Sequence, residues 1–426
     1  MEHNVEEITL TNGARGLLID IPGATVMSFR YHFRAGHFYG DSDDTYETAH
    51  IMEHMAFGAN ARFADGNAYE QEFTKNGAYH NAYTSDISMS YEAICADFEW
   101  DRIFDLQRMA ICTPRFLPRE LAAEKGNVKS ELTGYLNNHS RLLWPRIQRA
   151  LGDPVLTYNQ RLKTIANVTL KDVKEHYRKT HTTSNMRFVI AGKLSGRKQQ
   201  LIRELEAWPL PKGERLPRKI VHFKKARPVF IQRKDASNIT FALSMTIPRE
   251  LSLEEGDSLA FLNHILTNTM SSRIFGAARK KGLAYGMWSG AESGMGSATW
   301  DFGGQVNSET SSQLFDIIVR EMSNVLKGKI TDDEWEAAKT YYLGRYQMGA
   351  QTVSAINNIY ADMYFYRDMV LPYKEAPQMI RRARKEEAER MTREFIQQDT
   401  WVLAAVMNGG RDHLKALNDK IERLFI

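Results

Sequence analysis

Two histidines and a glutamate lie close together in the segment Thr48–Gly58, TAHIMEHMAFG. On a helix, His50 and His54 are one turn apart on the same face, so both imidazoles can reach one ion. Two imidazoles and a carboxylate from elsewhere, with a fourth position open, are the usual ligands of a catalytic zinc. Such a zinc lowers the pKa of its bound water to about 7. The neighbouring Glu53 is then placed to accept the proton of that water.

The alternative is a core helix that carries polar residues without a catalytic purpose. The rest of the segment is mostly apolar, and burying three titratable groups without a partner is costly. The order HxxEH is also the inverse of the HExxH pattern of zinc peptidases. Both points favour the metal site, and the apolar residues that argue for burial are Ile51, Met52, Met55 and Phe57.

A third ligand must come from another part of the chain. The segment 120–132, ELAAEKGNVKSEL, offers Glu120, Glu124 and Glu131. Glu124 and Glu131 are seven residues apart, two helical turns, and so share a face. One can bind the metal while the other orients a histidine. The residues alone do not choose between the two.

Both helices and strands are expected around these residues. Apolar residues recur with strand or helix periodicity in the first half of the chain. The expected strands are 7–10, 16–19, 26–33 and 187–192, and the expected helices are 45–57, 68–76, 100–111 and 118–138.

The pattern breaks at residues 208–218, where three prolines and a glycine lie among charged residues. Such a composition is typical of a linker. A strand at 239–245 and a helical segment at 256–269 follow. We therefore predict a first domain at 1–206, a linker at 207–218 and a second domain at 219–426.

The second half resembles a repeat of the first. When 49–54 is aligned with 259–264, Ala260 takes the place of His50, Asn263 that of Glu53 and His264 that of His54. When 120–132 is aligned with 334–346, Ala338 takes the place of Glu124 and Arg345 that of Glu131. If both halves share a fold, the polar residues of the first copy are not needed to form it, which indicates that they serve chemistry.

Composition narrows the functional class. The 426 residues are 43% hydrophobic and 25% charged, with a net charge of +4, which gives no case for binding nucleic acid or an anionic membrane. The basic run 381–385 is followed at once by two glutamates and indicates a solvated helix face. The first residues have no basic and apolar regions of the signal-peptide type, so we expect no signal peptide, and we expect no membrane span because no apolar run approaches the required length. The two cysteines, Cys95 and Cys112, are expected to be free thiols in the cytoplasm.

The HxxEH motif, with 76 residues between His54 and Glu131 and with Glu124 seven residues before Glu131, resembles the pitrilysin/insulysin family of zinc peptidases, family M16, in its short single-unit form. Three further segments resemble motifs of that family. They are the substrate-lining strand at 81–85, the second-half motif GLAY at 282–285 and the closing strand that follows Asn185-Met186.

The resemblance implies roles for individual residues. It makes His50, His54 and Glu131 the ligands of one Zn²⁺ per chain, Glu53 the general base and Glu124 a support for a ligand. Asn81, Ala82, Tyr83 and Thr84 would line the substrate. Tyr285 and an upstream arginine would contact the substrate and its polarised carbonyl. The family's arginine position holds Ala278 here, so Arg279 takes this role only after a shift of one residue.

The resemblance also implies an α+β fold. Two homologous domains, each an antiparallel sheet of about six strands with helices on one face, would form a clamshell around an enclosed chamber. The expected function is a zinc-dependent endopeptidase acting on unstructured peptides, working as a homodimer or as a heterodimer with a related subunit. The alternatives are a non-catalytic scaffold or partner subunit of the same fold, and a zinc hydrolase of non-peptide substrates. Because all five motif positions are kept, we favour an enzyme over the scaffold. The strand expected at 81–85 favours a peptide substrate, since an edge strand suits an extended peptide backbone.

Overall fold

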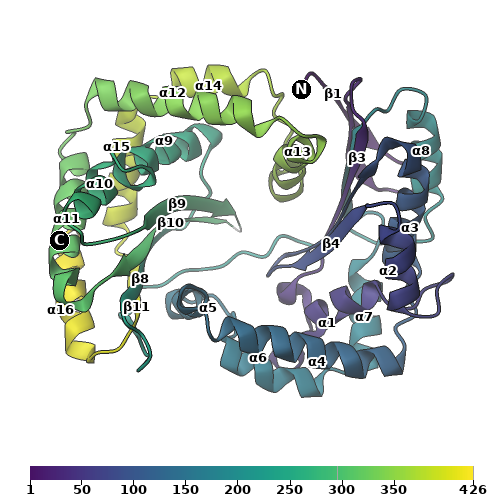
Figure 1. The fold of residues 1–426 in the computed structure, drawn as a ribbon, viewed down its shortest axis with the longest axis horizontal. Coiled ribbons are helices and arrows are strands. Elements are labelled where there is room, and N and C mark those ends of the chain that lie inside the picture. The colour runs from purple at the N-terminus through teal and green to yellow at the C-terminus, as the bar shows by residue number, and fades with distance from the viewer. Residues whose placement is uncertain (295, 426) are drawn as a thin grey trace. The chain divides into compact units, whose positions relative to one another are not determined.

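Two sheets, each with its own helices, organise the chain in the computed structural model, which describes residues 1–294 and 296–425 (Figure 1). By their internal contacts, the first unit comprises Met1–Thr133, Asn159–Lys219 and Gln347–Tyr373. The second comprises Gly134–Tyr158, Ile220–Tyr346 and Lys374–Ile426. The units are thus discontinuous in sequence, unlike the contiguous ranges 1–206 and 219–426 expected above.

The first sheet has six strands in the order β1-β2-β6-β3-β5-β4. Neighbouring strands are antiparallel except β2 and β6, which run parallel. The four expected strands are present, and β4 lies at one edge of the sheet. The bounds are β1 Asn4–Thr9, β2 Arg15–Asp20, β3 Val26–Arg34, β4 Tyr79–Thr84, β5 Ser88–Ala96 and β6 Met186–Gly192.

Both faces of this sheet are covered, whereas the sequence suggested helices on one face. Figure 1 shows α3 and α8 on one side and α13 on the other. The reason lies in the central strand β6, which is buried at every position and therefore needs apolar partners on both faces. Phe29 packs against Phe104 of α3, while Val189 and Ala191 pack with Ile356 of α13.

The helices of the first unit agree with the four expected ones to within a few residues. Helix α4 begins in the first unit, and its last residues are grouped with the second. The bounds are α1 Thr48–Ala56, α2 Gly66–Thr74, α3 Trp100–Cys112, α4 Pro118–Tyr135, α6 Tyr158–Thr164, α7 Leu170–Thr180, α8 Lys198–Glu206 and α13 Val353–Arg367.

The second sheet repeats the first. Its order, β7-β11-β8-β10-β9, matches β2-β6-β3-β5-β4, and its β7–β11 pair is again parallel. The internal repeat suggested by a few aligned residues is therefore present in the topology. The bounds are β7 Val229–Gln232, β8 Ile239–Ile247, β9 Met287–Gly294, β10 Ser297–Val306 and β11 Trp401–Met407.

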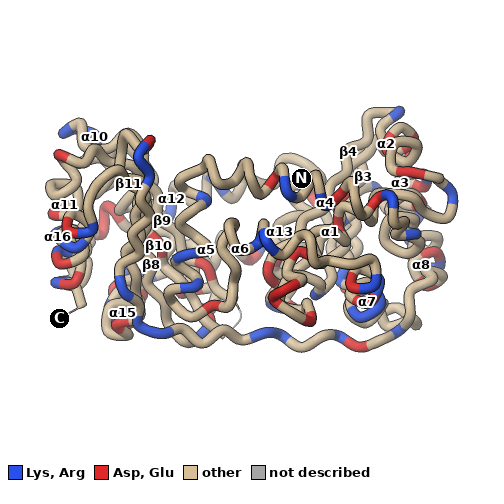
Figure 2. Tube along the Cα trace, turned by 90° about the horizontal axis from the view of Figure 1, so that it is seen from below, with Lys and Arg blue, Asp and Glu red and all other residues tan. Residues whose placement is uncertain are grey.

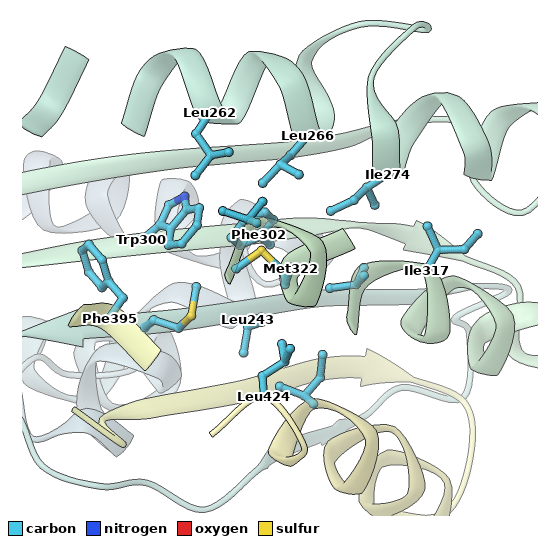
Figure 3. Packing of buried hydrophobic residues seen from close by; sticks show 14 of the residues in the cluster. Leu243, Leu262, Leu266, Ile274, Trp300, Phe302, Ile317, Met322, Phe395 and Leu424 are labelled. Carbon is cyan, nitrogen blue, oxygen red and sulfur yellow. The ribbon is translucent and has the colours of Figure 1, made fainter. Parts of the chain in front are cut away.

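The main core of the second unit lies between this sheet and its helices. Figure 3 shows Trp300, Phe302 and Leu243 from the strands meeting Leu262 and Met322 from the helices. The opposite face is covered by α5, whose apolar residues pack on β8 and β11. The bounds are α5 His139–Leu151, α9 Leu253–Asn263, α10 Arg273–Lys280, α11 Ser311–Leu326, α12 Asp332–Gly349, α14 Ala376–Arg382, α15 Lys385–Gln397 and α16 Arg411–Glu422.

The predicted linker lies along the first unit and is fixed by hydrogen bonds. Trp208 is buried against Tyr31. Further along, the carbonyl of Leu216 accepts a hydrogen bond from Arg34, at 2.6 Å, and that of Pro217 accepts one from Tyr39, at 2.9 Å. Proline and charge marked the absence of regular structure correctly, but gave no sign of these contacts.

Charged residues of both signs occur along the helices, as Figure 2 shows for α11 and α16. Among the described helices, none has both the length and the apolar content that crossing a bilayer requires. Cys95 and Cys112 are both buried free thiols.

Candidate metal centre

Helix α1 carries the HxxEH motif and is held firmly in the first unit. Of its residues only His54 is not fully buried. Ile51, Met52 and Met55 are wholly inaccessible and fix the helix from its apolar side. The polar residues at positions 50, 53 and 54 lie on the remaining face, toward α4 and the edge strand β4.

Three side chains converge as the motif predicts. The His50 Nε2 atom lies 3.4 Å from Oε2 of Glu131, and the His54 Nε2 atom lies 3.7 Å from the same oxygen. The two imidazole rings are nearly perpendicular, with centroids 5.0 Å apart. The three possible ligand atoms all lie within 4.8 Å of one another, a spacing at which one ion can bind all three. Glu131 of α4, and not Glu124, is therefore the carboxylate that faces both histidines.

The outer nitrogen of each histidine has a carboxylate partner. The Nδ1 atom of His50 lies 3.0 Å from Glu47, and that of His54 lies 3.0 Å from Glu124. An ionised carboxylate can only accept, so each Nδ1 donates its proton and each Nε2 is left as the electron-pair donor. This is how metal-binding imidazoles are usually oriented, and the donor set fits a zinc ion.

The sequence-based assignment missed Glu47 and Arg161. The carboxylate of Glu47 is completely buried and accepts two hydrogen bonds from Arg161, at 2.5 and 3.0 Å. Burial opposes its charge, but His50 and Arg161 outweigh burial and lower the pKa of Glu47 to about 2. The spacing of Glu47 three residues before His50 was a usable signal. Nothing in the sequence marked Arg161, which lies 114 residues further on.

The surroundings of the two imidazoles favour positive charge. Burial lowers the pKa of His54, yet hydrogen bonds to Glu124 and Glu131 outweigh it and raise that pKa to about 10. The pKa of His50 is likewise raised, because Glu131 and Glu47 overcome burial. Without a metal the cluster thus retains protons at the ring nitrogens, and a bound cation would take their place.

Glu53 lies beside His50 and His54 and is not part of the group of three possible ligands. Its side chain is almost fully buried. Burial raises the pKa of Glu53, against the opposing effects of His50 and of the Thr84 hydroxyl. A carboxylate whose pKa is raised above its usual value holds a proton more readily, which suits general-base chemistry.

The predicted substrate strand forms the edge of the first sheet, and α1 packs beside it. In β4, Ala82 is buried and Thr84 lies toward Glu53, whereas Asn81 and Tyr83 lie on the opposite face of the sheet. One side of β4 has no neighbouring strand, so its backbone groups on that side can pair with an extended peptide.

Tyr285 and Arg279 lie together in the second unit. Tyr285 is 83% exposed, and the Arg279 guanidinium carbon lies 4.5 Å from the centroid of its ring. Ala278, which holds the family's arginine position, is completely buried. Tyr285 also borders a cavity of about 240 Å³ within this unit, together with Trp144 and Trp288.

Models of one protein family match both halves of the chain. A model of the insulinase family, peptidase family M16, matches residues 17–153. A second model, the peptidase M16 inactive domain, matches residues 167–342. The chain belongs to peptidase family M16.

Individual M16 relatives are distant. The mitochondrial-processing peptidase subunit beta of Caenorhabditis elegans is 25% identical over 187 residues, which is 43% of this chain and 40% of that protein. The match therefore spans less than half the length of that relative.

Two solved structures show the M16 fold over nearly the whole chain. A peptidase M16 inactive domain from Pseudomonas fluorescens has a TM-score of 0.83 at 20% identity, covering 95% of this chain and 98% of its own. A protease from Helicobacter pylori has a TM-score of 0.82 at 17% identity, and the match covers 95% of this chain and 100% of that protease. At these identities the likeness concerns the fold alone.

Proposed function

We propose that this M16 protein is a zinc-dependent endopeptidase that hydrolyses unstructured peptides. The observation that carries the proposal is the orientation of the ligands. Both Nε2 atoms face Glu131, and each Nδ1 is held by a carboxylate of its own. Two imidazole nitrogens and one carboxylate oxygen are thereby directed at a common point, where a cation can bind all three.

In this proposal His50, His54 and Glu131 hold one zinc ion. The bound ion supplies Lewis acidity and makes an attacking water acidic near neutral pH. Glu53 accepts the proton of that water and delivers it to the amine that leaves when the peptide bond breaks. Glu47 and Glu124 keep the two imidazoles in the tautomer and orientation that binding requires.

The edge strand β4 supports a peptide as the substrate. An extended chain can hydrogen-bond along its free side, and a folded protein cannot, because its own backbone groups are already paired. This pairing depends little on side chains, so a broad range of unstructured peptides would bind. Tyr285 and Arg279 keep the roles that the family resemblance implies, as contacts to the carbonyl under attack.

A non-catalytic role is the second candidate. It is favoured by the match of residues 167–342 to the family's inactive domain and by the likeness to a protein named as a subunit. Against it, the first unit keeps every residue that the chemistry needs. A homodimer, or a heterodimer with a related subunit, is compatible with either candidate.

One small disulfide-bonded protein, offered in two states, tests the function. We expect the reduced and alkylated chain to be cut at several bonds and the native form to survive, as read by mass spectrometry. No cleavage of either state by zinc-loaded protein would support the non-catalytic candidate. Equal cleavage of both states would refute the edge-strand mechanism and the predicted enclosed chamber.

A further inference from the structure

The face of β4 that points away from Glu53 carries two exposed aromatic side chains. Tyr79 and Tyr83 alternate along the strand and are each 47% exposed. Asn81 lies between them on the same face, and its side chain accepts a hydrogen bond from the backbone of Ala82. The two rings therefore form an exposed aromatic surface on the edge strand.

A carboxylate lies directly behind these tyrosines. Glu92 of β5 is opposite Asn81 in the strand register. Its Oε1 atom accepts hydrogen bonds from both phenols, at 2.7 Å from Tyr83 and 3.3 Å from Tyr79. The Glu92 carboxylate is thereby held by the hydroxyl groups of both tyrosines.

The charge of this group is not balanced. Arg30 of β3 pairs with Glu92 on one side and lies 3.5 Å from Asp362 of α13 on the other. One guanidinium thus serves two carboxylates, and an excess negative charge remains. The Asp362 side chain is 61% exposed, so this charge is accessible from solvent.

A peptide paired with β4 would place alternate side chains on this face. The residue opposite Asn81 would lie between the two tyrosine rings, about two strand spacings, or roughly 10 Å, from β5. A long side chain with a positive end would cover a tyrosine ring and bring its charge toward Glu92. Cations bind well over the faces of tyrosine rings, while a carboxylate there would be repelled.

We propose that Tyr79, Asn81, Tyr83 and Glu92 form a subsite for a lysine or arginine side chain of the peptide, called here the basic subsite. The inference rests on the proposed function and narrows its substrate class to peptides with a basic residue at one fixed distance from the cut bond. An apolar side chain at this place would add no positive charge to the group of Glu92, Arg30 and Asp362, in which two carboxylates share one guanidinium.

Cleavage of a mixed peptide library, read by mass spectrometry, tests the basic subsite. For the wild type we expect lysine and arginine to be enriched roughly 3- to 10-fold at one position relative to the cut. Glu92→Gln and the exposed pair Tyr79→Ala/Tyr83→Ala should each remove most of this enrichment. Tyr83→Phe should keep most of it, because the ring remains.

The matched control is Glu6→Gln. Glu6 is an exposed glutamate on β1, the strand at the opposite edge of the same sheet. Its substitution should leave the enrichment unchanged. Equal loss in Glu6→Gln and Glu92→Gln would overturn the subsite and indicate an effect of net charge.

A binding measurement separates this inference from the proposed function. Zinc-loaded Glu53→Gln protein is titrated with fluorescent peptides that differ only in carrying lysine, leucine or glutamate at the enriched position, or at each position in turn if no peptide is cut. Tighter binding of the lysine peptide, lost in the added Glu92→Gln variant, supports the subsite even where cleavage fails. Cleavage without any basic preference, or equal binding of the three peptides, overturns the subsite while leaving the peptidase proposal intact.

Discussion

Helices α1 and α9 occupy the same place in the two units, each as the first α-helix after the strand β3 or β8. In α9 the aligned residues are Ala260, Asn263 and His264. Asn263 accepts a hydrogen bond from the Trp300 indole at 2.8 Å, and His264 stacks on Tyr341. Neutral packing therefore completes this position in the second unit. The ionisable group in α1 is not a requirement of the fold.

The partner helices differ in the same way. In α4, Glu124 and Glu131 face the histidines of α1. In α12, Ala338 is completely buried at the first aligned position, and Arg345 takes the second. Among the described residues, the one group of histidines and acids with metal-binding spacing is His50, His54 and Glu131. One copy of the repeat thus carries the candidate metal site, and the other keeps the same framework without it.

The largest effect is expected from His54→Ala. It removes one of three ligands, so zinc content should fall from about one ion per chain to near zero, and turnover should be lost with it. The protein should still fold, because His54 is the one residue of α1 that is not fully buried, and alanine is a good helix former. Elemental analysis measures the zinc content, and circular dichroism shows whether the variant is folded.

His264→Ala is the matched control for that variant. His264 stacks on Tyr341 and has no aligned ligand partners, so zinc content and turnover should stay as in the wild type. Full zinc retention in His54→Ala would show that the metal is not bound by the histidines of α1.

Glu53→Gln should separate the base from the ligands. An amide cannot accept a proton, so turnover should fall about 10²- to 10⁴-fold while zinc stays bound. Steady-state kinetics and metal analysis on one preparation give both values. Glu254→Gln, on the solvent side of α9, should change neither. If zinc were lost in Glu53→Gln, Glu53 would be a ligand.

Tyr285→Phe should have a smaller effect. Loss of one hydrogen bond to a developing oxyanion typically costs about 10²- to 10³-fold in turnover. Zinc content should not change. Unaltered kinetics would leave the second unit without a part in the chemistry.

The smallest expected effect is on folding stability. It follows from a comparison of two buried acids, Glu47 and Asp301. Glu47 is paired and has a low pKa, whereas Asp301 of β10 is buried with one oxygen unpaired, and burial raises the pKa of Asp301 to about 7. The folded protein therefore keeps a proton on Asp301 that the unfolded chain releases near pH 4. Stability should weaken as the pH rises from about 4 to 7.

Asp301→Asn removes that dependence. Relative to the wild type, the variant should gain up to roughly 4 kcal/mol in unfolding free energy between pH 4 and pH 8. Urea unfolding followed by tryptophan fluorescence at the two pH values measures the gain. A constant difference across this range would show that Asp301 is ionised in the folded protein.

Residues close together in sequence made much of the site predictable. His50, Glu53 and His54 lie within five residues, and periodicity fixed the helix that carries them. Arg161 could not be found, because its contact with Glu47 depends on how distant helices pack. The same reason hid the places of α5 and α13: both are apolar on the side they bury, and a local pattern does not say which sheet a helix covers.

The most direct test of the central claim is a zinc titration of chelator-stripped protein, with peptide cleavage and folding measured at each step. We predict a folded, inactive protein whose activity rises linearly and levels off at one zinc per chain, with no such rise in His54→Ala. Full cleavage by stripped wild type, or equal restoration of His54→Ala, would contradict a catalytic metal at His50, His54 and Glu131.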